Sequence, residues 1–511
     1  MIELGADGID RRAYARIVHD RERLEIADET LAAVDAARAR MLAHVEAGSP
    51  AYGVTTGLGH FAGVELGAAE QDALQRSLLT ARAAGLGPPL PAEVVRGAML
   101  LRLTGFLSRT VGVSADACRF LRARIDEDWS PVVPQGPYGA AGEIGPLAHL
   151  FQTFVGEGLV EVEGERITAA EALRRSGVEP FRPKPREGLA FIGGSPLATA
   201  LAIRLTDRFR DLLEAATTAA ALGLALTGMS ARALSTEVAA IGGDEDERRV
   251  CRRIAELCEH QPVWEGTVQP PVSTRILPQV HGAALGAIEA VDAVVAGRLR
   301  AVSDSPLFLE EADGVEGIFP SGGFHALRVT LGLEALGIAV AHVVNLVEKR
   351  LHRLLDGRYS GLPDQLTSSP GVQAGVVVLH KSVVGLAASA RLLAAPASVN
   401  AMDTSTGQED VQSFTFLVAE RLDRALDDLE AAIACELVAL RQAAALRTDP
   451  LVSSELSVTL AALASAVPPF DADRSASGDI QRVRALVRDG RFGSPSAGSG
   501  SQACRDGEGE S

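Results

Sequence analysis

The 511-residue sequence is poor in several residue types, and each shortage narrows the class of protein. Lysine occurs only three times, so arginine carries almost all of the positive charge, and the excess of acidic residues gives a formal net charge of −17. This balance argues against nucleic acid or an anionic membrane surface as the main partner, but it leaves room for a small anionic ligand in a locally positive pocket. Asparagine occurs only twice, at positions 345 and 400.

Cysteine is also scarce. The five cysteines are an odd number and include no C-x-x-C pair, which is typical of reduced thiols rather than of a disulfide framework. They are Cys118, Cys251, Cys258, Cys435 and Cys504. The first residues contain no apolar run of the secretory type, and the uncharged stretch between Glu214 and Arg232 has the alanine-rich composition of a buried helix. We therefore expect a soluble, cytoplasmic protein without a membrane-spanning segment.

Apolar residues with helical spacing are abundant. Hydrophobic residues make up 47% of the chain, which suffices for a large core and excludes a disordered protein. Proline is absent from 397–449, where leucine and isoleucine recur every three or four residues. The stretches 321–362, 281–300 and 215–231 show the same period, whereas alternating β-branched runs are scarce. The pattern predicts a mainly α fold with a bundle of long helices.

Changes of composition along the chain suggest three parts. Residues 1–200 are expected to form a helical and loop-rich domain, and residues 201–490 a bundle of long helices. The polar, glycine- and serine-rich segment 491–511 is expected to be a flexible tail. Glycine- and proline-rich loops interrupt the helices, and loops held by rigid helices are where sites are usually built.

Four of these loops carry a recognisable pattern when they are taken together and in order. They are AYGVTTGLGHFAG from Ala51, GPYGAAGEIGPLAHL from Gly136, QPPVSTRILPQVHG from Gln269 and PASVNAMDTSTGQEDVQS from Pro396. With several shorter segments between them, they resemble the aromatic amino acid ammonia-lyase family, which includes histidine, phenylalanine and tyrosine ammonia-lyases and the related aminomutases. The resemblance covers about residues 50 to 415, and it implies a histidine/phenylalanine ammonia-lyase-like fold.

The resemblance also implies an assembly and a chemistry. Members of this family are homotetramers that act on small molecules, and loops of three subunits assemble each active site. Their electrophile is a methylidene-imidazolone, made from an Ala-Ser-Gly tripeptide of the chain itself. The serine loses water to give a methylidene group that captures the substrate amine, and a tyrosine hydroxyl removes the β-proton.

The sequence departs from the family pattern at the electrophile. The aligned tripeptide is Ala140-Ala141-Gly142, and alanine has no hydroxyl to lose, so we expect no methylidene-imidazolone and no other cofactor. Four further family positions are changed: an asparagine aligns with Gly193, a tyrosine with Val272 and a histidine with Val411, and the asparagine before Phe-His is missing. These five changes favour a natural homologue over a laboratory Ser→Ala variant of an ordinary lyase.

Other family positions are kept, and the resemblance assigns them roles. Tyr52 aligns with the catalytic base, although a tyrosine needs a positive or hydrogen-bonding neighbour to act as a base near neutral pH. Glu409 is either a proton carrier or a structural partner of Arg275. A guanidinium suits a carboxylate bidentately, so Arg275 is assigned to the substrate carboxylate, the alternative being an ion pair with a protein acid. Arg82 stands at the side-chain selector, where it either meets an anionic or carbonyl group of the substrate or turns outward.

The predicted site thus has two catalytic residues, Tyr52 and Glu409. Its predicted substrate-contacting residues are Arg275, Arg82, Gly193, Gln279, Gln408 and His325, of which the last three fit scaffold hydrogen bonds better than reactive roles. No HExxH, P-loop or Gly-x-Gly-x-x-Gly motif suggests a metal or nucleotide site.

Three functions remain open on the sequence. The first is an enzyme of specialised metabolism that works without the electrophile, by acid–base elimination, isomerisation or cyclisation of a carboxylate- or carbonyl-bearing small molecule. The second is a methylidene-imidazolone lyase or aminomutase inactivated by Ser→Ala at position 141. The third is a non-catalytic ligand-binding or scaffold protein.

Overall fold

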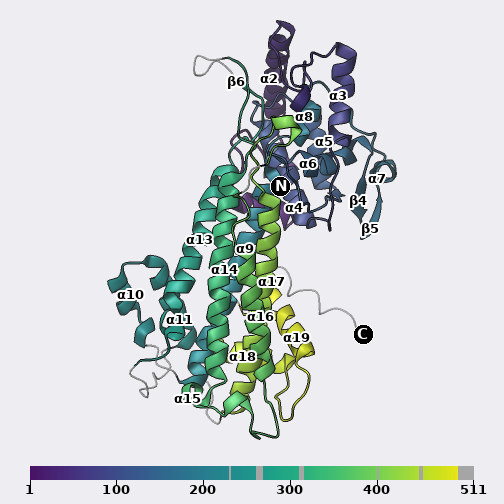
Figure 1. Ribbon diagram of the computed structural model, residues 1–511. Coiled ribbons are helices and arrows are strands. Elements are labelled where there is room, and N and C mark those ends of the chain that lie inside the picture. Colours follow the sequence, from purple (N-terminus) through teal and green to yellow (C-terminus); the bar gives the residue numbers. More distant parts are fainter. Residues whose placement is uncertain (229–231, 260–268, 310–315, 400–401, 448–452, 493–511) are drawn as a thin grey trace. The chain divides into compact units, whose positions relative to one another are not determined.

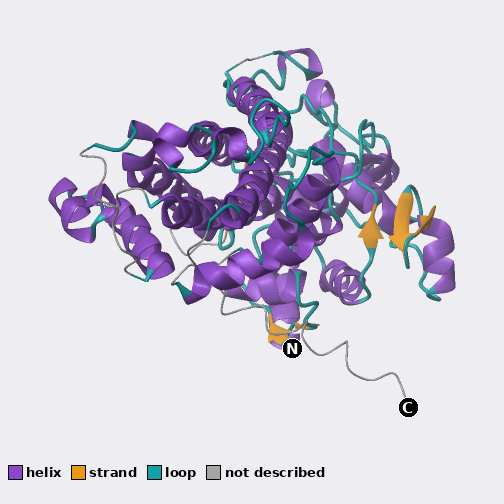
Figure 2. Cartoon of the chain, turned by 90° about the horizontal axis from the view of Figure 1, so that it is seen from below, coloured by secondary structure: helices purple, strands orange, loops and turns teal. Residues whose placement is uncertain are grey.

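The computed structural model describes residues 1–228, 232–259, 269–309, 316–399, 402–447 and 453–492 of the chain. Asn400 and Cys504 lie outside the described residues, as does the predicted tail from residue 493 onward. The prediction of a mainly α fold is confirmed, and strands are few and short (Figure 2).

The chain divides into two compact units, each assembled from three segments. Unit 1 consists of Met1–Leu205, Ala290–Glu334 and Pro396–Glu420. Unit 2 consists of Thr206–Glu289, Ala335–Ala395 and Arg421–Ser511. Four long helices contain residues of both units: α9 (Pro196–Thr227), α13 (Leu277–Arg298), α14 (Leu327–Leu354) and α17 (Thr415–Ala445).

Unit 1 is built mainly from short and medium helices. They are α1 (Arg11–Val18), α2 (Asp28–Glu46), α3 (Ala68–Thr80), α4 (Ala92–Leu107), α5 (Ala115–Asp126), α6 (Ile144–Phe151), α7 (Ala169–Arg175) and α8 (Glu187–Ile192). Single 3₁₀ turns are η1 (Gly59–Phe61), η2 (Gln152–Val155) and η6 (Ser405–Gly407). The N-cap side chains of Asp10 and Ser114 accept backbone N–H groups at the starts of α1 and α5, as such residues commonly do.

Three small sheets complete the described part of unit 1. The parallel pair is β1 (Ile2–Glu3) and β2 (Leu24–Glu25). The antiparallel three-stranded sheet is β3 (Ser130–Pro131), β4 (Leu159–Val162) and β5 (Glu165–Thr168). The antiparallel pair is β6 (Leu307–Leu309) and β7 (Gly317–Phe319).

Unit 2 is helical in its described residues. Besides its share of the long helices it contains η3 (Arg232–Leu234), α10 (Thr236–Gly242), α11 (Glu245–Cys258), α12 (Val272–Arg275), α15 (Gly357–Ser360), η5 (Asp364–Leu366), α16 (Val377–Leu393), α18 (Ser454–Ala466) and α19 (Ser477–Arg488). The predicted apolar stripe of α17 is confirmed, because Leu422, Leu426, Leu429, Ile433, Leu437 and Leu440 are each at most 2% exposed. Burial of this stripe, rather than helix propensity, stabilises such a long helix.

Within the described residues, three apolar helical stretches are long enough to cross a membrane by length and composition alone. They are Glu187–Thr227, Leu277–Arg298 and Leu327–Leu354. In the first, 89% of the apolar window is covered by the protein itself, which is what a core helix requires. The interpretation of the stretch after Glu214 as a buried helix is therefore confirmed.

Aromatic packing fixes α8, the helix that leads into Gly193. The ring of Phe191 packs against those of Phe106 and Phe151, at centroid distances of 5.3 and 4.8 Å. Edge-to-face and tilted pairs of this kind add to the stabilisation from burial alone. Because the chain has few aromatic residues, their concentration here makes α8 a rigid support in unit 1.

A close approach between α8 and α3 provides a first test of this packing. A Cβ atom added to Gly188 would lie 2.2 Å from the carbonyl oxygen of Gln75, and backbone cannot give way as a flexible side chain does. We expect Gly188→Ala to lower the free energy of unfolding by about 1–3 kcal/mol, measured by chemical denaturation. The matched control is Gly105→Ala in α4, where an added Cβ meets no atom within 4 Å. Equal stability of the two variants would contradict the close approach.

Candidate active site

The Tyr52 loop joins α2 to α3 in unit 1, and a buried glutamine holds it. Gln75 of α3 donates from Nε2 to the carbonyl of Gly53 at 3.1 Å, and its Oε1 accepts the Gly188 N–H at 3.1 Å. Tyr52 is 37% exposed, and its hydroxyl oxygen accepts the N–H of Gly59 at 2.8 Å. This bond uses the hydroxyl oxygen as an acceptor and fixes its position beside Gly59.

Glu409 connects the tripeptide loop to a segment far away in the sequence. Its Oε2 accepts the N–H of Ala141 at 2.8 Å, across 268 residues of chain, and its Oε1 accepts the Ser405 hydroxyl at 3.1 Å. The turn is closed by the backbone of Thr404, whose N–H donates to the Glu409 carbonyl at 2.9 Å. The middle residue of the tripeptide is therefore held by an oriented carboxylate.

Arg82 follows the end of α3 and is partly buried. Burial lowers the pKa of the Arg82 guanidinium, and the proximity of Tyr52 and Glu409 acts in the opposite direction. The guanidinium is therefore within electrostatic reach of both predicted catalytic groups. The structure thus brings Tyr52, Arg82, Ala141 and Glu409 together in unit 1.

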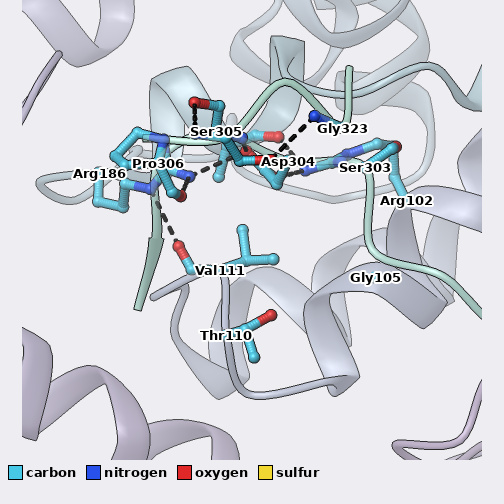
Figure 3. Close-up of polar contacts among 12 residues, drawn as sticks. Arg102, Gly105, Thr110, Val111, Arg186, Ser303, Asp304, Ser305, Pro306 and Gly323 are labelled. Atoms are coloured by element: carbon cyan, nitrogen blue, oxygen red, sulfur yellow. Dashed lines mark hydrogen bonds and ion pairs between the residues drawn. The ribbon is translucent and has the colours of Figure 1, made fainter. Parts of the chain in front are cut away.

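Gly193 lies against a buried ion cluster formed by Arg102, Arg186 and Asp304. Figure 3 shows the side chains of this cluster. Asp304 is fully buried, and its two carboxylate oxygens bind Arg186 Nη2 at 2.9 Å and Arg102 Nη2 at 2.5 Å. A Cβ atom on Gly193 would lie 2.7 Å from Asp304 Oδ1. The lack of a side chain at 193 therefore matches the space that this carboxylate leaves. Removing one partner of such a cluster typically lowers the free energy of unfolding by about 3–5 kcal/mol. The cluster therefore stabilises the segment at Gly193.

Two further predicted residues of unit 1 are Gln408 and His325. Gln408 is exposed, next to Glu409. Among the described residues, the buried Nε2 of His325 has no hydrogen-bond partner. His325 lines a cavity of about 270 Å³ together with Arg298 and Arg328. Its neighbour Phe324 lies beside the tripeptide, since a Cβ on Gly142 would be 3.3 Å from that ring.

Arg275 and Gln279 belong to unit 2, and the structure describes them there. Arg275 ends α12 and donates from Nε to the carbonyl of Pro270 at 3.0 Å. Gln279 donates from Nε2 to Glu247 Oε2 at 2.8 Å. Six of the predicted positions outside the tripeptide thus belong to unit 1, and the other two belong to unit 2.

Sequence reasoning missed Glu143, the residue directly after the tripeptide. Its carboxylate is buried and accepts the N–H groups of Leu197 and Ala198, at 2.7 and 2.6 Å, at the start of α9. Burial raises the pKa of Glu143 to about 8, against the opposing effect of these N–H groups and of Arg298 and Arg102. The sequence offered one signal for this residue, an acidic side chain between Gly142 and an apolar helix. Its hydrogen-bond partners could not be predicted, because they are more than 50 residues away in the sequence.

The raised pKa of Glu143 predicts a pH-dependent stability. Folding favours the protonated form, so its stabilising contribution is fully present below about pH 4.5, the ordinary pKa, and is lost as the pH rises through about 8. Glu143→Gln keeps a carbonyl acceptor but does not ionise. We expect the melting temperature of the wild type to fall relative to that of Glu143→Gln over this range.

The control for this experiment is Glu163→Gln, a change at an exposed glutamate in the turn between β4 and β5. Its melting temperature should follow that of the wild type at every pH. Parallel curves for the wild type and Glu143→Gln would show that the buried carboxylate does not titrate in this range.

Comparison with known proteins finds relatives along most of the chain. A family model described as aromatic amino acid lyase matches residues 9–467. Histidine ammonia-lyase of Symbiobacterium thermophilum is 35% identical over 448 residues, which are 87% of this chain and 88% of that protein. Histidine ammonia-lyase of Gloeobacter violaceus is 34% identical, and the match covers 92% of each protein.

Solved structures agree with this result. The structure of histidine ammonia-lyase from Trypanosoma cruzi has a TM-score of 0.86 at 26% identity, covering 96% of this chain and 94% of that chain. Ergothionase from Treponema denticola shares the fold, with a TM-score of 0.92 at 22% identity, covering 96% and 99% of the two chains. The predicted histidine/phenylalanine ammonia-lyase-like fold is confirmed.

These relatives correct the expectation of a protein without a cofactor. Histidine ammonia-lyases at 31–35% identity, together with the solved ammonia-lyase structures, indicate a prosthetic group of the methylidene-imidazolone type. The expectation rested on a single residue, Ala141. That residue does not fit formation of the group from serine, because its methyl group has no hydroxyl to lose.

Proposed function

Because the chain belongs to the aromatic amino acid lyase family, we propose that it performs acid–base chemistry on a carboxylate-bearing small molecule. The reaction is an elimination, isomerisation or cyclisation of the kind that specialised biosynthetic pathways use. The observation that carries this proposal is the grouping of Tyr52, Arg82 and Glu409 around the tripeptide. Such a grouping of an acid, a base and a cation is more than a scaffold needs.

Tyr52 is the proposed general base. The Gly59 N–H donates to the tyrosine oxygen, and the Arg82 guanidinium interacts electrostatically with Tyr52. Partial exposure lets a substrate approach the hydroxyl, and Gln75 keeps the loop in place. Glu409 is the proposed second proton carrier, since its carboxylate is near the same cation.

Arg275 is the proposed clamp for the substrate carboxylate, and it completes the site from another subunit. Gln279, Gln408 and His325 are proposed to support the site by hydrogen bonds. A homotetramer in the cytoplasm is the proposed assembly, and exposed apolar side chains on α14 favour a covering partner copy. They include Leu331 and Ile338, which are 53% and 47% exposed.

Arg82 sets the proposed substrate preference. A guanidinium at the selector position favours a substrate with a second anionic or carbonyl group over one with a purely apolar ring. The guanidinium is within electrostatic reach of Tyr52 and Glu409, so a group bound to it is near the proposed catalytic residues.

Substitution of the base and of the clamp tests these roles. The wild type is first screened for turnover of aromatic amino acids and of aryl carboxylates with a second acidic or carbonyl group. We expect Tyr52→Phe to lower kcat by about 10²–10⁴-fold, since general acid–base catalysis is lost. We expect Arg275→Met to act mainly on KM, because it removes the carboxylate contact.

The matched control is Tyr359→Phe in α15, which removes a hydroxyl from a tyrosine with the same 37% exposure. It should leave turnover unchanged. Full activity of Tyr52→Phe and Arg275→Met in folded oligomers would refute the roles. If no compound in the screen is turned over or protects the protein against thermal unfolding, a non-catalytic scaffold is the better account.

A second candidate is a methylidene-imidazolone ammonia-lyase that has lost its serine, and the histidine ammonia-lyase relatives favour it. Ala141→Ser restores the hydroxyl in a loop whose N–H is already held by Glu409. We expect intact-mass measurement of this variant to show loss of water from the tripeptide. We expect no ammonia release from histidine, phenylalanine or tyrosine, because Gly193, Val272 and Val411 still differ from the family.

Ammonia release from one of these amino acids would establish the second candidate instead. An unchanged mass would show that the loop, and not only residue 141, is unsuited to ring formation.

A further inference from the structure

Unit 2 contains a cluster of nitrogen and oxygen ligands that includes no residue of the Tyr52 group. Glu348 and His352 lie one turn apart on α14, so their side chains share one face of that helix. His380 reaches the same place from α16, which runs beside α14 (Figure 1). One ligand atom from each of the three side chains lies within 4.8 Å of the others.

Contacts within the cluster keep the three groups together. His380 Nε2 and Glu348 Oε1 are 2.7 Å apart, and the rings of His352 and His380 stack at a centroid distance of 4.6 Å with an interplanar angle of 22°. Glu348 is buried, His380 is partly buried and His352 is exposed. The Glu348 carboxylate thus lies on the buried side of the cluster, and the cluster is open to solvent at His352.

We propose that Glu348, His352 and His380 bind a divalent transition-metal ion of the Zn²⁺ type. Two imidazoles and one carboxylate are a common ligand set for zinc, which binds nitrogen and carboxylate oxygen at about 2.0–2.2 Å. Ligand atoms that already lie within 4.8 Å of one another need only small side-chain rotations to reach such distances. Three protein ligands leave a fourth position for water, on the exposed side.

Lys349 would compete with the metal ion for the Glu348 carboxylate. Its Nζ lies 2.6 Å from Glu348 Oε2, while Oε1 faces His380. A bound dication therefore shares the carboxylate with an ammonium group, and the repulsion lowers its affinity. Removing the lysine charge should strengthen metal binding, an outcome that a merely structural cluster does not predict.

Isothermal titration of Zn²⁺ into the untagged, full-length protein tests the proposal. We expect one ion per chain in the wild type, and affinity weakened by more than about tenfold in His352→Gln and in His380→Gln, since even outer-shell changes act on this scale. Lys349→Met should bind more tightly than the wild type. His342→Gln, a change at an exposed histidine of α14 outside the cluster, should bind as the wild type does.

Exposure of His352 means that its replacement leaves the fold intact, so a loss of binding in that variant reports on the ligand itself. The proposal is overturned if the wild type takes up no Zn²⁺, or if His352→Gln and His380→Gln bind as tightly as His342→Gln. Weaker binding by Lys349→Met than by the wild type would also overturn it. The readout is binding alone, so it is independent of the acid–base function proposed for Tyr52.

Discussion

The hydrogen bond from the Ala141 N–H to the Glu409 carboxylate is the contact on which the candidate site depends. It joins two loops that are separated by 268 residues, and the same carboxylate holds the turn at Ser405. Arg82 lies within electrostatic reach of Glu409 and of Tyr52, so one acid positions the tripeptide and shares a cation with the proposed base. A charge-assisted bond of this type is stronger and better directed than a neutral one.

A buried carboxyl group and a buried ion cluster behind the loops provide the rigidity that such a site needs. Glu143 ties the end of the tripeptide loop to the start of α9, and Asp304 ties Arg102 to Arg186 beside Gly193. Each group is expensive to bury and is stable only with its partners in place. The chain has few aromatic residues, and it holds its loops with the Phe cluster around Phe191 of α8 together with these buried polar contacts.

Periodicity and ordered motifs predicted the helical fold, the stripe of α17 and the family, because each depends on residues close in sequence. The same reasoning could not predict where side chains point or which distant residues they contact. Whether Arg82 turns inward depends on Tyr52 and Glu409, and the role of Glu143 depends on α9. The expectation of no prosthetic group was wrong, because it was drawn from one residue of a tripeptide, whereas the histidine ammonia-lyase relatives indicate such a group. The Glu348 cluster was missed, since His380 lies on another helix.

Hydrogen–deuterium exchange of the full-length protein measures most directly whether Glu409 holds the tripeptide loop. The comparison is between the wild type, Glu409→Ala, which has no acceptor, and Glu409→Gln, which keeps a carbonyl oxygen in the same place. The account predicts faster exchange in peptides containing Ala141 for Glu409→Ala, and near wild-type protection for Glu409→Gln. Unchanged protection at Ala141 in Glu409→Ala would contradict the central role assigned to this bond.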